Sequence, residues 1–221
     1  MNELADPMRQ ALELAWESAR AGSLGIGAVI VDGDGNTVAT GRNRLAESEA
    51  GDDHLAGTSL AHAELNALAK LRWGAHGGRQ LALWTTLEPC LQCAGAIRMA
   101  PITEVHVLAP DPLFPDMDRM RDINAFVASQ WPAYHRRPAD AFAAFALLLQ
   151  AHTFTFWGAN LPGWSTALPR ITALARELAA SGELIAFAAD GTDLDVVLEA
   201  LWPRLVPAVD DVAELWRQES Q

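Results

Sequence analysis

Residues 86–97 read TLEPCLQCAGAI. Pro89 pre-sets the first turn of a helix, and we expect that helix to run from about Cys90 to Met99. Cys90 and Cys93 lie on one face of this helix, so both thiols can point toward a single ion. The positive end of a helix also lowers the pKa of a thiol and favours the thiolate that zinc requires. Since these are the only two cysteines, a disulfide framework is excluded, which leaves a metal site, a redox pair or two core thiols.

A second helix is predicted upstream, over Leu60–Trp73 (LAHAELNALAKLRW). At a first turn entered from a loop, His62 can bind a metal ion while Glu64 reaches over the ion without binding it. One histidine and two cysteines give three ligands, which is typical of a catalytic zinc with a fourth position left for water. Zinc lowers the pKa of that water toward roughly 7, and a nearby carboxylate can accept the proton and pass it to a ring nitrogen or a leaving amine.

The surrounding pattern predicts an α/β fold. In chain order, the expected elements are a helix over Pro7–Ala21, a hairpin of strands Gly27–Asp32 and Thr37–Gly41, a polar loop over Arg42–Ser59, and strands over Leu81–Thr86 and Thr103–Ala109. Strands that alternate with single helices imply right-handed crossovers and a mixed sheet covered by helices on both faces.

The alternation of strands and helices ends near Pro110, and the segments that follow are mainly helical. We therefore divide the chain into a core over residues 1–110 and a mainly helical C-terminal extension over residues 111–221. Helical spacing marks four segments, Ala139–Ala151, Ala167–Ala180, Leu194–Leu205 and Val209–Arg217. A loop is expected over Gly158–Pro169 and a short strand over Leu184–Ala188.

Charge and hydropathy limit the partners. The 28 acidic and 16 basic residues give a net charge of -12, which repels polyanions. The loop Leu45–Ser59 adds acidic side chains beside the predicted pocket, namely Glu47, Glu49, Asp52 and Asp53. Nucleic acid is therefore an unlikely partner on this reading, and a small heterocyclic amine is favoured.

The longest apolar stretch, Ala141–Leu149, is far shorter than the roughly 20 residues that cross a bilayer. With no signal peptide visible, we expect a cytoplasmic protein without membrane contact.

The motifs resemble those of the cytidine deaminase-like superfamily, especially its branch of tRNA adenosine deaminases and guanine or other nucleobase deaminases. The pattern H-x-E…P-C-x-x-C is the signature of zinc deaminases. The resemblance spans roughly Met8–Pro110. It rests on four runs, GAVIV at 27–31, GRNR at 41–44, HAEL at 62–65 and the stretch at 86–97.

This resemblance implies a three-layer α-β-α fold with a mixed central sheet, bound Zn²⁺ and a homodimer or higher oligomer. It also implies hydrolytic replacement of a ring amine by a carbonyl, with loss of ammonia. In this reading His62, Cys90 and Cys93 bind the metal and Glu64 is the catalytic residue. The resemblance also implies that Asn43 contacts the substrate ring and that the backbone at Ala63 lines the pocket.

The sequence departs from the tRNA-editing relatives after the last strand of the core. Where they continue with a glycine-rich stretch and a basic tail, this chain has the acidic, proline-bearing stretch Asp111–Asp118 and then the extension. Ligands in open α/β sheets favour strand ends, so this stretch is expected to border the pocket, with Phe114 a candidate for stacking on a ring. An ordinary surface connector is the alternative. Neither His135 nor His152 is expected to bind the zinc.

Three functions follow from these motifs. The first is a deaminase of a free base, a nucleoside or a related small heterocycle, and a tRNA adenosine deaminase is the alternative in the same class. From another class comes a non-catalytic binding or scaffold protein with a structural zinc. Glu64 argues against this third function, because a structural site has no need of an unligated carboxylate above the metal.

Overall fold

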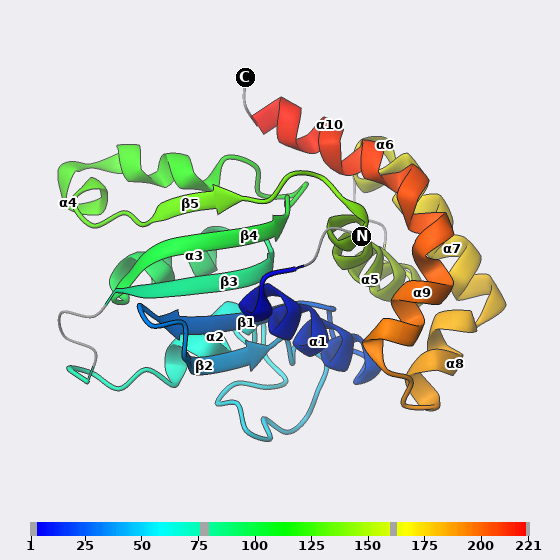
Figure 1. Cartoon of the computed structure of the whole chain (residues 1–221), viewed down its shortest axis with the longest axis horizontal. Helices are drawn as coiled ribbons and strands as arrows, with labels where there is room; N and C mark the ends of the chain where they lie inside the picture. The colour runs from blue at the N-terminus through cyan, green and yellow to red at the C-terminus, as the bar shows by residue number, and fades with distance from the viewer. Residues whose placement is uncertain (1–3, 76–79, 160–162, 220–221) are drawn as a thin grey trace.

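The computed structural model describes residues 4–75, 80–159 and 163–219. They form a five-stranded sheet with the strand order β2-β1-β3-β4-β5 (Figure 1). The strands are β1 (Gly27–Asp32), β2 (Thr37–Arg42), β3 (Leu81–Leu87), β4 (Ile102–Ala109) and β5 (Ala133–Arg136). β1 pairs antiparallel with β2 and β3, whereas β3, β4 and β5 are parallel. The mixed sheet and the hairpin are confirmed.

Helices cover both faces of this sheet. α1 (Asp6–Arg20) packs on one face, and α2 (Ala63–Ala69) and α3 (Leu91–Met99) lie behind the sheet in Figure 1. The three-layer α-β-α architecture is therefore confirmed. Among the described helices, none combines the length and the apolar character needed to cross a membrane.

Two glycines allow helices to approach the sheet closely. A Cβ atom on Gly27 would lie 2.1 Å from the carbonyl oxygen of Ala11 in α1. A Cβ atom on Gly41 would lie 2.3 Å from the carbonyl oxygen of Ala63 and 2.4 Å from the amide nitrogen of Ala67. Because real Cβ atoms do not approach backbone so closely, glycine at position 41 lets β2 pass directly against the first turn of α2.

The second half of the chain is mainly helical, as expected. Its helices are the 3-10 helix η1 (Met117–Ile123), α4 (Ala125–Ala128), α5 (Ala141–Phe156), α6 (Trp164–Ala167), α7 (Pro169–Ser181), α8 (Glu183–Ala189), α9 (Leu194–Leu205), the 3-10 helix η2 (Val206–Ala208) and α10 (Val209–Glu219). Every residue of α5 from Ala141 to Thr153 is buried, because α5 packs against α1 and the sheet as well as against α7, α9 and α10 (Figure 1). One hydrophobic core thus joins both halves.

Two expectations about the extension are wrong. The strand expected over Leu184–Ala188 is part of helix α8, in which Leu184 alone is buried. A short run of apolar residues suits either a strand or a helix, and here Gly182, with φ at 70°, separates α7 from a second short helix. The loop expected over Gly158–Pro169 contains α6, although residues 160–162 lie outside the described part of the chain.

The sheet also gains a strand that the sequence pattern does not predict. β5 pairs in parallel with β4 although it follows residue 110. Residues beyond the predicted boundary therefore complete the sheet, and the division of the chain at that residue stays a prediction.

Candidate metal and active site

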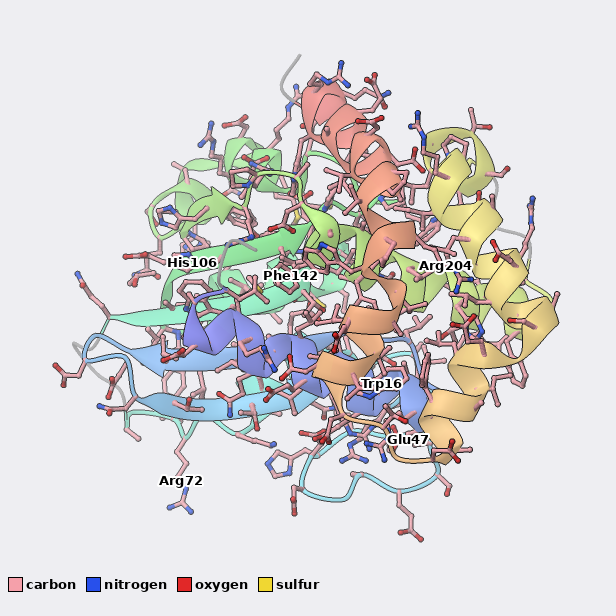
Figure 2. The ribbon with its side chains drawn as sticks, turned by 45° about the vertical axis from the view of Figure 1, so that its right-hand side comes forward. Trp16, Glu47, Arg72, His106, Phe142 and Arg204 are labelled. Atoms are coloured by element: carbon pink, nitrogen blue, oxygen red, sulfur yellow. The ribbon has the colours of Figure 1, made fainter. Side chains whose placement is uncertain are left out.

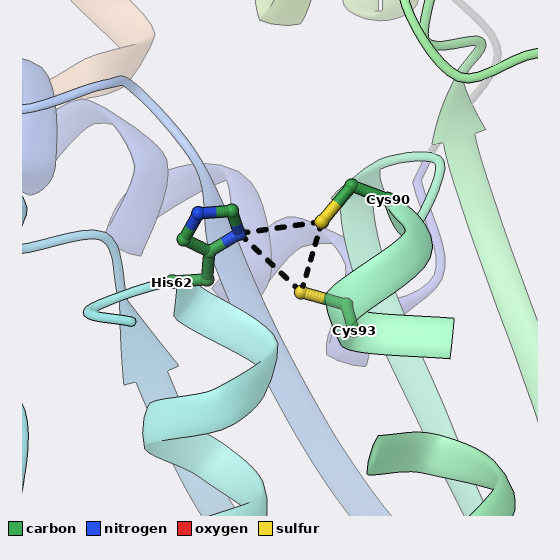
Figure 3. A group of neighbouring side chains, drawn as sticks. All are labelled: His62, Cys90 and Cys93. Carbon is green, nitrogen blue, oxygen red and sulfur yellow. Dashed lines mark hydrogen bonds between the residues drawn. The ribbon is translucent and has the colours of Figure 1, made fainter. Parts of the chain in front are cut away.

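Three side chains from two helix starts converge behind the sheet. His62 Nδ1 lies 3.6 Å from Cys90 Sγ and 3.4 Å from Cys93 Sγ, and the two sulfur atoms are 3.7 Å apart (Figure 3). A tetrahedral zinc ion with ordinary bond lengths has edges of about 3.8 Å between two sulfur ligands and about 3.6 Å between sulfur and nitrogen. The triangle of donor atoms therefore fits zinc, and its chemistry of one imidazole and two thiols suits the same ion.

The backbone explains why these atoms meet. His62 and Cys90 both have extended backbone, with ψ angles of 152° and 173°, and both immediately precede a helix. The helices thus begin at Ala63 and Leu91, later than expected, and each N-cap side chain leaves the helix at its start. Cys93 lies in the first turn of α3 and is buried.

Glu64 lies beside this triangle without being part of it. Its side chain is almost wholly buried on α2, and Thr85 on β3 donates a hydrogen bond of 3.0 Å to Oε1. The other oxygen, Oε2, lies 3.4 Å from Cys93 Sγ. The carboxylate is therefore held at the edge of the donor triangle, one oxygen anchored to the sheet and the other facing the site.

The site prepares one sulfur for metal binding. Hydrogen bonds from Cys93 and His62 lower the pKa of Cys90 to about 4. The same bond to Cys90, together with burial, raises the pKa of Cys93 well above its usual range. One thiolate is thus formed in advance, and the second proton is one that a metal ion must displace. Burial also raises the pKa of Glu64, which is the direction expected of a carboxyl group that accepts and returns a proton.

Asn43 carries a side-chain amide donor close to the segment that leads into His62. It is fully buried after β2, and its Oδ1 accepts a hydrogen bond from the backbone of Leu45. Its Nδ2 has no hydrogen-bond partner within the described part of the chain. The backbone of Arg44 bonds to Ala61, so Asn43 lies next to the segment that leads into His62. A buried donor without a partner is costly unless a ligand or water satisfies it.

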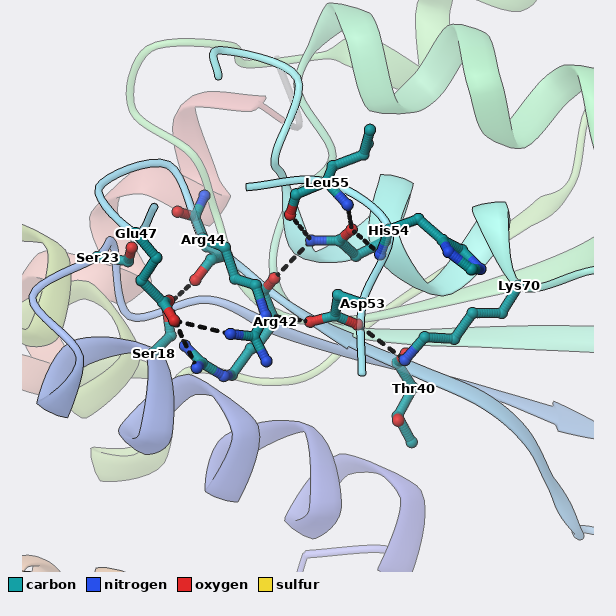
Figure 4. A network of polar contacts seen from close by, with 12 residues as sticks. Ser18, Ser23, Thr40, Arg42, Arg44, Glu47, Asp53, His54, Leu55 and Lys70 are labelled. Carbon is teal, nitrogen blue, oxygen red and sulfur yellow. Dashed lines mark hydrogen bonds and ion pairs between the residues drawn. The ribbon is translucent and has the colours of Figure 1, made fainter. Parts of the chain in front are cut away.

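The acidic loop differs from what its sequence suggests. Glu47 pairs with Arg42 and Arg44, and Asp53 pairs with Arg44 and Lys70 (Figure 4). All five side chains are at most 22% exposed. Three cations therefore neutralise two of the four acids, so the acidic sequence of this loop does not make nucleic acid an unlikely partner.

The other residues singled out in the sequence have varied surroundings. Ala63 is fully buried at the start of α2, between His62 and Glu64. Phe114 is 37% exposed, and its amide donates to the carbonyl oxygen of Asp111. His135 and His152, on β5 and α5, are not members of the group formed by His62 and the two cysteines.

Sequence reasoning missed an ion pair between a partly exposed arginine, Arg136, and a fully buried acid, Glu88, which lies close in sequence to the candidate metal ligand Cys90. Arg136 Nη2 on β5 donates a hydrogen bond of 2.7 Å to Glu88, whose side chain is fully buried two residues before Cys90. Asp118 accepts a second bond from Arg136. Glu88 belongs to the stretch that decides the fold, but no local signal could assign it a partner 48 residues away.

Asp111 was predicted only as part of a bordering stretch. It is buried, and burial raises its pKa to about 7, with further contributions from the charges of Cys90, Glu88 and Glu64. The carboxyl group therefore lies within electrostatic reach of the site. The position of an aspartate directly after a strand end is the signal that could have identified it.

Known deaminases are similar to this sequence. The family model for the cytidine and deoxycytidylate deaminase zinc-binding region matches residues 1–109. A tRNA-specific adenosine deaminase of Streptococcus pyogenes serotype M1 is 32% identical over 120 residues, which cover 52% of this chain and 64% of that protein. The protein of the same name from serotype M18 (strain MGAS8232) is 32% identical over 120 residues, which cover 52% of this chain and 69% of that protein. Because both names specify tRNA, these relatives do not support the expectation that nucleic acid is an unlikely partner.

Solved structures of deaminases are also similar. A structure from work on A-to-I editing by tRNA:A34 deaminases has a TM-score of 0.48 and 27% identity, and the match covers 59% of this chain and 96% of that one. The guanine deaminase from Bacillus subtilis has a TM-score of 0.40 and 34% identity, with 47% and 62% covered.

Proposed function

We propose that this chain, which belongs to the cytidine deaminase-like superfamily of zinc-binding deaminases, hydrolyses a ring amine to a carbonyl and releases ammonia. The favoured substrate is a nucleobase, a nucleoside or a related small heterocycle. The observation that carries the proposal is the buried carboxylate of Glu64 beside a triangle of three donor atoms. A structural zinc site in a scaffold protein would gain nothing from that carboxylate, since burying a charge without ligation is costly.

The metal would be held by His62, Cys90 and Cys93, and its contribution is to make water a nucleophile at neutral pH. Glu64 moves the protons. Its Oε2 accepts a proton from the attacking water and passes it to the ring nitrogen next to the amine-bearing carbon. The second proton of the water then reaches the amine through the same carboxyl group, so that ammonia leaves and the carbonyl remains.

The substrate ring would be oriented by groups around the donor triangle. The free Nδ2 of Asn43 is a donor for a ring nitrogen or a carbonyl oxygen. The backbone of Ala63 is proposed to line the pocket between His62 and Glu64. Phe114, in the stretch that follows β4, is proposed to stack on the ring. A homodimer is proposed as the assembly, to be checked by light scattering of the purified protein.

A tRNA adenosine deaminase is the second candidate. Two observations favour it, the tRNA-specific relatives at 32% identity and the ion pairs that neutralise Glu47 and Asp53. The net charge of -12 acts against this candidate, because the protein as a whole repels the phosphates of tRNA and each phosphate contact would need a local cation.

Ammonia release distinguishes the candidates. Purified, zinc-loaded protein is incubated with free bases, nucleosides, amino-heterocycles and an anticodon stem-loop that contains adenosine. Ammonia from a small molecule supports the first candidate, and inosine in the RNA supports the second. The Glu64→Gln variant is the matched control for contaminating deaminases. Absence of turnover on the whole panel, with zinc bound, would favour the scaffold protein instead.

A further inference from the structure

A second group of side chains that could hold a metal ion lies on the opposite side of the sheet from Thr85 and Glu64. His106 on β4 pairs in parallel register with His135 on β5. Glu104 precedes His106 by two residues and therefore projects from the same face. Paired residues of neighbouring strands and residues two apart on one strand are the positions from which three side chains of a sheet can reach one point.

The distances within this cluster suit a small ion. Glu104 Oε2 lies 3.3 Å from the Nε2 atoms of both His106 and His135. All three ligand atoms lie within 4.8 Å of one another. Ligands of an ion with bonds of about 2.1 Å are separated by roughly 3.0 Å in octahedral and 3.4 Å in tetrahedral geometry. The two separations fall in that range, so the carboxylate already lies at a suitable distance from each ring nitrogen, and only the direction of a ring has to change.

The cluster borders open space, so an ion can enter. A cavity of about 260 Å³ is lined by Trp84, His106, His135 and Arg136, together with residues at the N-terminal end of α1. Figure 2 shows His106 beside this end of α1. The side chains of Glu104 and His135 are 45% and 49% exposed.

We propose that Glu104, His106 and His135 form a second metal site, which takes a late first-row divalent cation such as Ni²⁺ or Zn²⁺. Two imidazoles and one carboxylate are ligands that these ions accept, and three protein ligands leave positions for water. This site has no sulfur ligand, in contrast to the site of His62. The proposal is independent of the deaminase activity, since it rests on the other face of the sheet.

Metal binding requires one ring to move. Trp84 stacks on His106 at 3.8 Å with an interplanar angle of 4°, and His106 stacks on His135 at 4.6 Å and 18°. Nearly parallel rings direct their in-plane lone pairs side by side, so they do not converge on one ion. His135, half exposed on the edge strand, is the ring with room to turn, whereas Trp84 keeps His106 in place. Trp84 is thereby a fluorescent reporter for a paramagnetic ion at this site.

Nickel titration of protein that carries one equivalent of zinc per chain, which the thiolate site of Cys90 and Cys93 should hold, tests the proposal. Calorimetry is expected to show one further equivalent of Ni²⁺ bound per chain, with a zinc-sensitive dye showing that the first site keeps its metal. His135→Ala and Glu104→Gln should each weaken this binding by at least roughly tenfold, since loss of a mere hydrogen-bond partner of a ligand already costs 10–100-fold. Both side chains are partly exposed, so neither variant empties the core. The exposed His54 offers the matched control, and His54→Ala should bind Ni²⁺ unchanged.

Tryptophan fluorescence locates the bound ion. Ni²⁺ is expected to quench part of the emission in the unmodified protein, and Trp84→Phe should lose this quenching but keep the bound equivalent. Three results would overturn the proposal: no Ni²⁺ bound beyond the zinc, Ni²⁺ uptake matched by release of zinc, or unchanged affinity in the His135 variant. Failure of ammonia release in the same preparation would concern the first site alone.

Discussion

Glu64 should differ from the three proposed metal ligands in the effect of its substitution. Glu64→Gln keeps the shape and the bond from Thr85 but cannot carry a proton, so turnover should fall by about 10²–10⁴-fold while the zinc stays bound. Steady-state kinetics together with zinc content by elemental analysis measure both effects. His62→Ala, by contrast, should lose the zinc itself. Near-normal turnover in Glu64→Gln would assign the proton transfer to another group.

The affinity for zinc should depend on pH. The metal-free site keeps a proton on Cys93, because the bond to Cys90 and burial raise the pKa of Cys93, and the bond to Cys90 raises the pKa of His62 as well. Zinc binds the deprotonated forms, so its affinity falls as the pH falls and rises as the pH rises. Between pH 6 and 8, the logarithm of the affinity should rise by about one to two per pH unit, one for each proton released. Competition with a chromophoric chelator measures this slope, and a slope of zero would show that zinc binding releases no proton, so that Cys93 and His62 are already deprotonated in the metal-free site.

At the scale of elements, the approach of β2 to α2 controls the position of His62. Gly41→Ala places a methyl group against the backbone of Ala63 and Ala67, and forced overpacking of this kind costs about 1–3 kcal/mol. Urea unfolding should show this loss, and the zinc affinity should fall because the start of α2 is displaced. Gly33→Ala is the control, since a Cβ atom there meets nothing within 4 Å. Equal stability of the two variants would contradict the packing argument.

The elements that the sequence predicted are those with a local signal. The hairpin of β1 and β2 follows from its Gly-Asp-Gly-Asn turn, and α9 was predicted to the residue. β5 was missed because its four residues have no strong apolar alternation and are defined by pairing with β4. Short elements of this kind depend on tertiary contacts, which local patterns do not record.

The same distinction applies within the site. His62, Cys90 and Cys93 could be predicted because their spacing at two helix starts is the signal. The ion pair of Glu88 and Arg136 could not, since it depends on β5 lying beside β4. The charge of the loop after β2 was misjudged for a different reason. Counting acids in sequence does not show that Arg42, at the end of β2, pairs with Glu47, or that Arg44, within the loop, pairs with Asp53.

At the scale of the whole molecule, the extension shares its core with the part that holds the site. One cluster of buried side chains runs from Leu4 to Leu215, and α5 lies within it. Gly25 approaches α5 so closely that a Cβ atom there would lie 2.5 Å from Leu149. An interface packed like a protein interior couples the stabilities of the two sides.

We therefore expect the chain to unfold in one transition. Phe145, fully buried in the middle of α5, is the probe: Phe145→Ala should cost about 3–5 kcal/mol, because a large cavity remains. Denaturant unfolding of cobalt-substituted protein can be followed by thiolate absorbance at Cys90 and Cys93 and by far-ultraviolet circular dichroism. The two midpoints should coincide. They should also move together in the variant, although Phe145 lies on α5 and the two cysteines lie at the start of α3. A dichroism transition that moves to lower denaturant while the thiolate absorbance stays in place would show instead that residues 111–221 fold as a separate domain, since an independent core would absorb the loss alone.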